Sequence, residues 1–184
     1  MKGRLSELLV CPWCAGPFEL ECFSRSERTC EVTEGLLRCQ CGRAYPIVDT
    51  IPRILNDALA LFPEFAKRYA ERLPPAMTAA RLGGVDADVI RRTRDSFGYQ
   101  WTVFSDMVSD FRENFLQYIH PLDESFFPGK VGLDVGCGFG RHLYNAATFG
   151  AEMVGVDISA AVDAARRNTQ HLPNVHLVQA NLYH

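Results

Sequence analysis

Short apolar runs alternate with amphipathic stretches in the last third of the chain. Apolar runs at 131–135, 153–158 and 175–180 predict three β-strands, and the segments 141–149 and 160–170 between them have helical composition. Ser159 precedes the second helical segment and is a suitable N-cap. Strands that alternate with helices in this way are typical of β-α-β units. We therefore expect an α/β structure for residues 130–184.

The first of these strands runs directly into a glycine-rich turn. Residues 131–140 read Val-Gly-Leu-Asp-Val-Gly-Cys-Gly-Phe-Gly. Gly136, Gly138 and Gly140 allow a sharp bend where the strand ends and the free amide groups of the next helix begin. The G-x-G-x-G spacing differs from the dinucleotide pattern G-x-G-x-x-G. A carboxylate at Asp134 would repel a pyrophosphate and attract a positively charged ligand. The turn therefore indicates a site for a nucleoside ligand that carries positive charge, rather than for a dinucleotide.

Asp134 and the three glycines fit the pattern hh-D/E-h-G-x-G-x-G residue by residue. This is the first motif of the class I S-adenosylmethionine (SAM)-dependent methyltransferases, and the segment resembles their type 11-like members. The resemblance implies a Rossmann-like fold that binds SAM. It also implies that Asp134 orients the methionine end of SAM and that the glycine turn lets the backbone approach the cofactor.

Further cofactor-binding residues follow from the second and third predicted strands. Asp157 ends the second strand about 20 residues after the first glycine, where a ribose accepts a carboxylate. In the methyltransferases that it resembles, Ile158 would pack on the adenine. Asn181 stands where that family usually has an aspartate facing the adenine amino group, and an asparagine carbonyl can accept the same hydrogen bond. Cys137, inside the turn, is counted among the cofactor-binding residues of this motif and is expected to pack rather than to act as a nucleophile.

A complete doubly wound sheet has about five or more strands, whereas the chain stops at residue 184, just after the third. We therefore expect a carboxyl-terminally truncated methyltransferase domain that holds the cofactor half of the site. Positioning the acceptor for in-line attack on the SAM methyl group would supply much of the rate. No catalytic base can be named from the sequence.

Two close pairs of cysteines mark the amino-terminal part: Cys11 and Cys14, then Cys39 and Cys41. Four thiolates in two pairs, brought together by a hairpin, are the set that structural Zn²⁺ prefers. The segments 19–23 and 35–37 between them can form short strands. Cys22 and Cys30 remain possible substitutes if Cys39 or Cys41 does not reach the metal. Metal-free cysteines, a disulfide and a redox pair stay open as alternatives, although no thioredoxin-like pattern surrounds the C-x-x-C.

The residues around these cysteines resemble a known zinc-ribbon family. The phrases Leu-Leu-Val-Cys-Pro-Trp-Cys at 8–14 and Arg-Ala-Tyr-Pro-Ile-Val-Asp-Thr-Ile-Pro at 43–52 are similar to the ribbons that activate RNA and release-factor methyltransferases in trans. This resemblance covers residues 5–55. It implies a small, β-rich zinc ribbon fused to a SAM domain.

Three parts are therefore expected: a zinc ribbon at 1–56, a helical linker or lid at 57–129, and the first part of the SAM-binding domain at 130–184. Within the linker, a helical stripe is predicted over 58–73, a short helix over 88–97, and another from about 108 to 120. Tyr99, Gln100 and Trp101 either face the cofactor pocket or pack the interior, and aromatic residues at such spacing usually bury area.

Charge adds little about partners. Lys and Arg number 19 and Asp and Glu 22, which gives a net charge of −3, and no basic stripe indicates nucleic acid. No apolar run reaches the about 18 residues of a membrane span. Seven cysteines without a signal peptide favour a cytoplasmic protein. The methyl acceptor is small or macromolecular and, like the oligomeric state, cannot be identified.

Two other classes of function remain open. The chain could be a non-catalytic binding module, a zinc ribbon with a SAM fold that supports a partner enzyme. Alternatively, the glycine turn could serve a nicotinamide dinucleotide oxidoreductase. Binding of SAM, of S-adenosylhomocysteine and of NAD distinguishes these classes.

Overall fold

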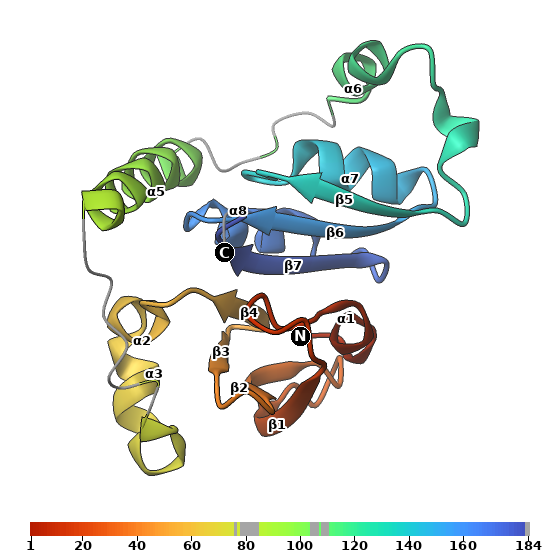
Figure 1. Cartoon of the computed structure of the whole chain (residues 1–184). Helices are drawn as coiled ribbons and strands as arrows, with labels where there is room; N and C mark the ends of the chain where they lie inside the picture. The colour runs from red at the N-terminus through yellow and green to blue at the C-terminus, as the bar shows by residue number, and fades with distance from the viewer. Residues whose placement is uncertain (76, 78–84, 104–106, 108–110, 183–184) are drawn as a thin grey trace. The chain divides into compact units, whose positions relative to one another are not determined.

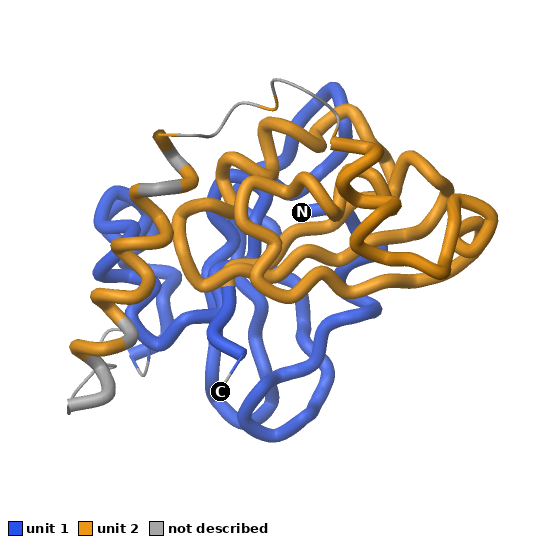
Figure 2. The backbone as a smooth tube through the Cα atoms, turned by 90° about the horizontal axis from the view of Figure 1, so that it is seen from above, with its two compact units in different colours: residues 1–87, 180–184 blue, residues 88–179 orange. Residues whose placement is uncertain are grey.

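The computed structural model of the chain describes residues 1–75, 77, 85–103, 107 and 111–182. It contains two compact units, one formed by residues 1–87 with 180–184 and the other by residues 88–179 (Figure 2).

The first unit begins with a four-stranded antiparallel sheet. After α1 (Gly3–Leu8), the strands β1 (Phe18–Arg25), β2 (Val32–Cys39), β3 (Ala44–Val48) and β4 (Ile51–Ile54) each pair with the next one along the chain (Figure 1). The β3–β4 turn places Asp49 and Thr50 at φ 51° and 69°, as a tight two-residue hairpin requires. The two strands expected at 19–23 and 35–37 lie inside β1 and β2. The amino-terminal part is thus small and β-rich, as predicted.

The helical segment that follows packs on this sheet. The prediction of a single helix over 58–73 is wrong. This segment forms α2 (Ala58–Leu61), α3 (Pro63–Arg68) and the 3₁₀ turn η1 (Ala70–Arg72). Pro63 begins α3 because proline has no amide hydrogen to continue a preceding helix. The apolar stripe nevertheless packs on the sheet: Phe65 is buried with Leu36 of β2, and the half-buried Phe62 and Tyr69 pack against them.

Ion pairs add to this packing. Glu21 of β1 binds Arg38 of β2 at 2.6 Å and Arg72 of η1 at 2.7 Å. Burial opposes ionisation of Glu21, but the hydrogen bonds from both arginines outweigh it and lower the pKa of this carboxyl. Arg68 binds Glu34 at 2.8 Å in the same way. The helices after the ribbon are therefore anchored to it by both apolar and charged contacts.

The second unit is built on a parallel sheet. Its order is β7-β6-β5, formed by β5 (Val131–Val135), β6 (Glu152–Asp157) and β7 (Val175–Ala180). The crossover helices α7 (Arg141–Thr148) and α8 (Ala161–Thr169) contact each other and both contact β6. The predicted α/β class is confirmed, and the elements lie within two residues of the ranges expected from the sequence.

Further helices precede this sheet. They are α5 (Val85–Val103), α6 (Arg112–Ile119) and the 3₁₀ turn η2 (Glu124–Phe126). The helix expected at 88–97 therefore extends further at both ends. The one expected from about 108 begins at Arg112, and residues 108–110 lie outside the described part of the chain. None of the described helices is long and apolar enough to cross a membrane.

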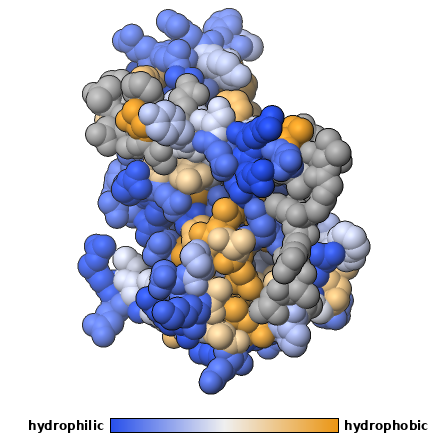
Figure 3. All heavy atoms as spheres, turned by 90° about the vertical axis from the view of Figure 1, so that its left-hand side faces the viewer, coloured by the Kyte–Doolittle hydropathy of each residue, from blue (hydrophilic) through white to orange (hydrophobic). Residues whose placement is uncertain are grey.

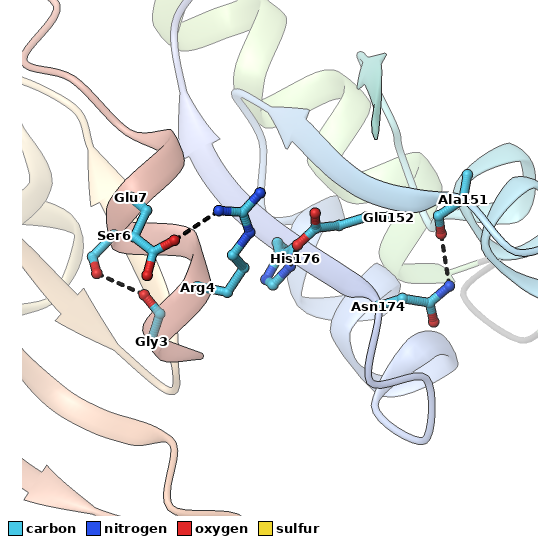
Figure 4. A network of polar contacts seen from close by, with 8 residues as sticks. All are labelled: Gly3, Arg4, Ser6, Glu7, Ala151, Glu152, Asn174 and His176. Carbon is cyan, nitrogen blue, oxygen red and sulfur yellow. Dashed lines mark hydrogen bonds and ion pairs between the residues drawn. The ribbon is translucent and has the colours of Figure 1, made fainter. Parts of the chain in front are cut away.

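Side-chain contacts fix the entry into β7. The side-chain amide of Asn174 donates to the carbonyl oxygens of Ala151 at 2.6 Å and of Ala147 at 2.8 Å. One residue into the strand, His176 Nε2 lies 3.1 Å from Glu152 Oε1 on β6 (Figure 4). These contacts hold the register of β6 and β7, and so the positions where both strands end.

One face of β5 is apolar and uncovered by the described residues. Val131, Leu133 and Val135 alternate along the strand and are 59%, 63% and 52% exposed. Figure 3 shows one side of the molecule, where hydrophobic residues lie at the surface among hydrophilic ones. β5 thus buries only the alternate positions Gly132 and Asp134 against its own unit.

The second unit is tightly packed around Gly155 of β6. A Cβ there would lie 2.9 Å from Leu177 Cδ2, 3.0 Å from Leu143 Cδ2 and 3.1 Å from Cys137 Sγ. We expect Gly155→Val to lower the free energy of unfolding by about 1–3 kcal/mol, because overpacking forces these neighbours apart. Urea unfolding measures this. Gly3→Val is the control, since no atom lies within 4 Å of its Cβ position. Equal unfolding midpoints for Gly155→Val and the wild type would contradict the packing.

Candidate cofactor and metal sites

The glycine turn between β5 and α7 has the backbone that its sequence requires. Gly136, Gly138 and Gly140 have φ values of 71°, 52° and 90°, a region that residues with a side chain rarely adopt. The amide groups of Gly136 and Cys137 donate to the Val156 carbonyl oxygen at 2.8 and 3.1 Å, which ties the turn to β6. No atom of the described residues lies within 4 Å of a Cβ placed on Gly136, so this part of the structure leaves open space at the turn.

Asp157 is the centre of the polar contacts at this turn. It is buried, and its Oδ2 accepts a hydrogen bond from the Gly138 amide at 2.9 Å. Its Oδ1 accepts from the Ser159 amide at 2.8 Å and from the Ser159 hydroxyl at 2.7 Å. The carboxylate at the end of β6 is therefore held against the glycine turn. Each oxygen of a carboxylate can accept about two hydrogen bonds, so capacity for a ligand hydroxyl remains.

Asp134 lies in a different environment at the end of β5. Burial raises the pKa of this carboxyl, and the charge of Asp157 acts in the same direction. The His142 ring and the Leu143 amide, both in the first turn of α7, oppose the rise. Oδ2 of Asp134 is buried without a hydrogen-bond partner among the described residues. An orphan carboxylate oxygen of this kind suits a cationic donor group on a ligand.

The other three predicted cofactor residues lie in different places. Cys137 is buried, which raises the pKa of its thiol well above the usual value, so it packs against β6 as an inert thiol. Ile158 is half-buried next to Asp157, and its backbone carbonyl accepts from the side-chain amide of Gln179 at 3.1 Å. Asn181 is buried, but it groups with the first unit. Its contact with a cofactor remains a prediction.

Trp101 of α5 lies over the glycine turn. Its indole atoms come within 3.6 Å of the Cβ position of Gly138, and its ring centroid is 5.2 Å from that of Phe139. Two residues earlier, Tyr99 is 74% exposed. The side chain of Gln100 lies outside the described part of the structure. Of the three aromatic-cluster residues singled out in the sequence, Trp101 is thus placed beside the turn and Tyr99 faces solvent.

Two supporting residues were missed in the sequence. Ser159 was expected to be the N-cap of the second helix, but the N-cap of α8 is Ala160. Ser159 instead donates to Asp157, and its hydroxyl accepts from the Ala161 amide at 3.2 Å. Asn168 of α8 donates to the Phe139 carbonyl oxygen at 2.9 Å. A serine two residues after an aspartate is a recognisable local pattern. Nothing in the sequence pairs Asn168 with Phe139, because that contact depends on how α8 packs.

Two tight turns of the first unit bring its paired cysteines together. In the first, the Cys11 amide donates to the Gly16 carbonyl and the Ala15 amide to the Cys11 carbonyl, both at 2.8 Å. In the second, the Cys39 amide donates to the Arg43 carbonyl at 2.8 Å, and Gly42 at φ 87° completes the bend. The two turns lie at adjacent ends of the antiparallel sheet, so their thiols meet.

The sulfur atoms of Cys11, Cys14, Cys39 and Cys41 all lie within 4.8 Å of one another. Cys14 Sγ is 3.3 Å from Cys39 Sγ, and Cys11 Sγ is 3.8 Å from Cys41 Sγ. Four sulfurs around one zinc ion at about 2.3 Å would be about 3.8 Å apart. The C-x-C spacing thus does not keep Cys41 from the cluster. Cys22 and Cys30 are exposed and lie outside this group.

Amide groups of the second turn act on its two thiols. The Arg43 amide donates to Cys41 and, against a smaller effect of burial, lowers the pKa of this thiol to about 7. The Cys41 amide likewise donates to Cys39, but burial and the neighbouring cysteines outweigh it and raise the pKa of Cys39 to about 12. A bound cation would remove this conflict, because coordination deprotonates a thiol outright.

Comparisons with known proteins agree with both halves of this description. Residues 133–184 match the family described as a methyltransferase domain. Residues 2–49 match the family of Trm112p-like proteins. One segment of the chain is thus similar to Trm112p-like proteins and another to a methyltransferase domain, and the two family resemblances drawn from the sequence are confirmed.

Solved structures with detectable similarity are more distant. The pyocyanin biosynthetic protein PhzM is 22% identical, with a TM-score of 0.34, over 66% of this chain and 36% of its own. The SAM-bound amino pentose methyltransferase CalS10 from Micromonospora echinaspora, involved in calicheamicin biosynthesis, is also 22% identical, with a TM-score of 0.25, over 55% of this chain and 36% of its own. The chain thus spans about a third of the length of these structures. The curated proteins contain no significant match.

Proposed function

We propose that this chain is a SAM-dependent methyltransferase with a structural zinc ribbon. The observation that carries the proposal is the arrangement of two acids at one glycine turn. Asp157 is held by the Gly138 amide, and Asp134 keeps an orphan buried oxygen beside the same turn. Within a segment that matches a methyltransferase domain, this pair suits a nucleoside at one end and a cation at the other.

Bound SAM would supply a methyl group on a sulfonium, already a good leaving group, to a nucleophilic acceptor. The residues of this chain would then bind and orient. Asp157 would accept from the ribose hydroxyls, and Asp134 would face the amino group of the methionine end. The open space at Gly136 allows the backbone to approach the ligand. Ile158, Cys137 and Asn181 complete the proposed cofactor set.

In the ribbon, the four clustered cysteines would hold the zinc ion as thiolates. Their sulfur positions fit a closed tetrahedral site, which is a structural rather than a catalytic arrangement. The proposed division into a ribbon at 1–56, a helical part at 57–129 and a cofactor part at 130–184, and a cytoplasmic location, complete this proposal. The acceptor is a small molecule or a macromolecule of unidentified class.

Calorimetric titration of the full chain tests the proposed cofactor. We expect SAM and S-adenosylhomocysteine to bind with dissociation constants of about 1 μM to 1 mM, the usual range for enzyme ligands, and NAD to bind more weakly. Trp101 supplies a second readout. The chain has two tryptophans, so in the variant Trp13→Phe only Trp101 remains. Its fluorescence emission should change when SAM binds, because Trp101 lies beside Gly138.

The outcomes separate the three classes of function. Absence of SAM binding in a protein that contains zinc would favour the non-catalytic module. Tighter binding of NAD than of S-adenosylhomocysteine would favour the oxidoreductase. A calorimetric signal with SAM but unchanged Trp101 emission would place the ligand away from the glycine turn.

A further inference from the structure

A cavity lies wholly within the first unit, beside the cysteine cluster. Its volume is about 580 Å³, within the range of about 300–1,000 Å³ typical of small-molecule pockets. The turn that holds Cys41 forms one wall, and the segment entering α2 forms another. The proposed methyl-transfer site uses none of its residues.

The floor of this cavity is apolar and its rim is polar. Ala44, Tyr45, Leu55 and Ala58 line it and are each at least 92% buried. Asn56 lies exposed at the rim, where its amide can donate or accept. Such a lining removes an apolar ligand body from water and orients it by a few polar contacts.

Trp13 and Arg43 form the most distinctive wall. Trp13 is 72% exposed, and the Arg43 guanidinium lies 4.0 Å from the centre of its ring. Arg43 also hydrogen-bonds to the Tyr45 hydroxyl. A guanidinium has five N–H donors, so donors remain for a ligand. An indole and a guanidinium that stack on each other therefore line the same cavity. Arg43 covers one face of the exposed Trp13 ring, and the other face can stack on a planar ring.

Charge narrows the chemistry of the occupant. Arg43 is the one basic side chain in the lining, and Cys41 of the cluster is part of the same wall. Four thiolates around one Zn²⁺ would carry a net charge of −2, which Arg43 offsets only in part. An anion would thus be repelled as well as attracted, whereas a neutral oxygen acceptor gains the Arg43 hydrogen bond without the repulsion.

We propose that this cavity binds an uncharged planar aromatic compound that bears an oxygen acceptor, with the ring against Trp13 and the oxygen toward Arg43. The preference for an uncharged ligand rests on the proposed zinc site. The cavity itself is independent of SAM binding, so failure of the SAM titration leaves this proposal intact.

Two probes of the same shape test the proposal on the full chain: naphthalene-2-carboxamide and naphthalene-2-carboxylate. Zinc content is measured first, so that loss of metal is recognised separately. In ¹H–¹⁵N spectra, we expect the carboxamide to shift the Trp13 indole N–H signal in a saturable way. The carboxylate should bind at least about threefold more weakly, as follows from the cluster charge.

Variants test whether Arg43 contacts the oxygen of the ligand. Arg43→Met should weaken carboxamide binding by about tenfold, the usual cost of losing a hydrogen bond to a charged group, and Arg43→Lys should restore part of it. Arg28→Met is the matched control, since Arg28 is exposed and outside the cavity lining. If Arg43→Met loses zinc or unfolds, Trp13→Leu on the exposed rim is the second variant. It should also weaken carboxamide binding, followed by the backbone amide signals of Arg43 and Asn56 because the indole signal is lost.

Three results would overturn the proposal. They are tighter binding of the carboxylate than of the carboxamide by zinc-loaded protein, equal affinities in Arg43→Met and wild type, and no saturable shift up to the solubility limit of the carboxamide. Light scattering tests whether the chain self-associates. Self-association that Trp13→Leu abolishes would show that a second copy of the chain covers the Trp13 and Arg43 wall of the cavity, and this too would overturn the proposal.

Discussion

Replacing Cys14 by serine is expected to release zinc and unfold the ribbon, whereas replacing Cys22 by serine is expected to do neither. A structural zinc ion contributes about 10–16 kcal/mol to the folding of small modules, as much as or more than the about 5–15 kcal/mol of a whole domain. Next to the two cysteine turns the apolar cluster is small: Cys11, Cys39 and Tyr45, with Phe18 and Ile54 packed against them. Without the metal, little would hold these two turns together.

The two variants form a matched pair. Cys14 and Cys22 are both exposed, so neither substitution leaves a cavity, but only Cys14 belongs to the cluster of four. Metal analysis should give about one zinc ion per chain for the wild type and Cys22→Ser, as one tetrahedral site requires, and far less for Cys14→Ser. Circular dichroism and amide dispersion follow the unfolding. If Cys14→Ser keeps its zinc and its melting temperature, the four cysteines are not the ligands.

Asp134→Asn and Asp157→Asn are both expected to weaken SAM binding more than about tenfold, the effect of losing a hydrogen bond to a charged group, yet to change stability in opposite directions. Burial raises the pKa of Asp134 in the folded state. Its ionised form therefore costs stability at neutral pH, and asparagine removes that cost. Asp157, in contrast, accepts from Gly138 through one oxygen and from Ser159 through the other. In asparagine one of these oxygens becomes an NH2 group, which only donates, so one of the two donors loses its acceptor.

The stability changes can be given a sign and a pH dependence. For Asp134, the wild type loses stability as the pH rises above the unfolded pKa, about 3.9, and through the higher folded one. The advantage of Asp134→Asn should therefore be present at pH 7 and vanish as the pH falls toward 4. Asp157→Asn should cost about 1–3 kcal/mol, because a buried donor loses its acceptor.

Urea unfolding at pH 7 and pH 4.5 and calorimetry with SAM measure these effects. Asp88→Asn is the control: it removes a charge from an exposed pair with Arg91 at 2.7 Å, which is worth at most about 1 kcal/mol. Destabilisation by Asp134→Asn at pH 7 would show that the carboxylate is stabilised in the fold rather than reserved for a ligand. Unchanged SAM affinity in both variants would remove the glycine turn from the cofactor site.

Much of the fold follows from local patterns. The alternation of strands and helices over 131–180, the glycines that need positive φ, and the two cysteine pairs are all set by residues close together in sequence. The division of 58–73 into three short pieces was missed. Its apolar stripe has helical spacing, and the packing of Phe65 and Tyr69 on the ribbon outweighs continuity across Pro63.

The sequence by itself determined which chemical groups the chain offers: four thiols in two pairs, and two acids at the ends of neighbouring strands. Only the tertiary structure decided what distinguishes them. Asp134 and Asp157 look alike in sequence, but one is left with an orphan oxygen and the other is held by Gly138 and Ser159. Likewise, the cavity beside Trp13 and Arg43 exists because two turns and the start of α2 converge. Burial and hydrogen-bond partners come from segments distant along the chain, and local sequence patterns do not carry that information.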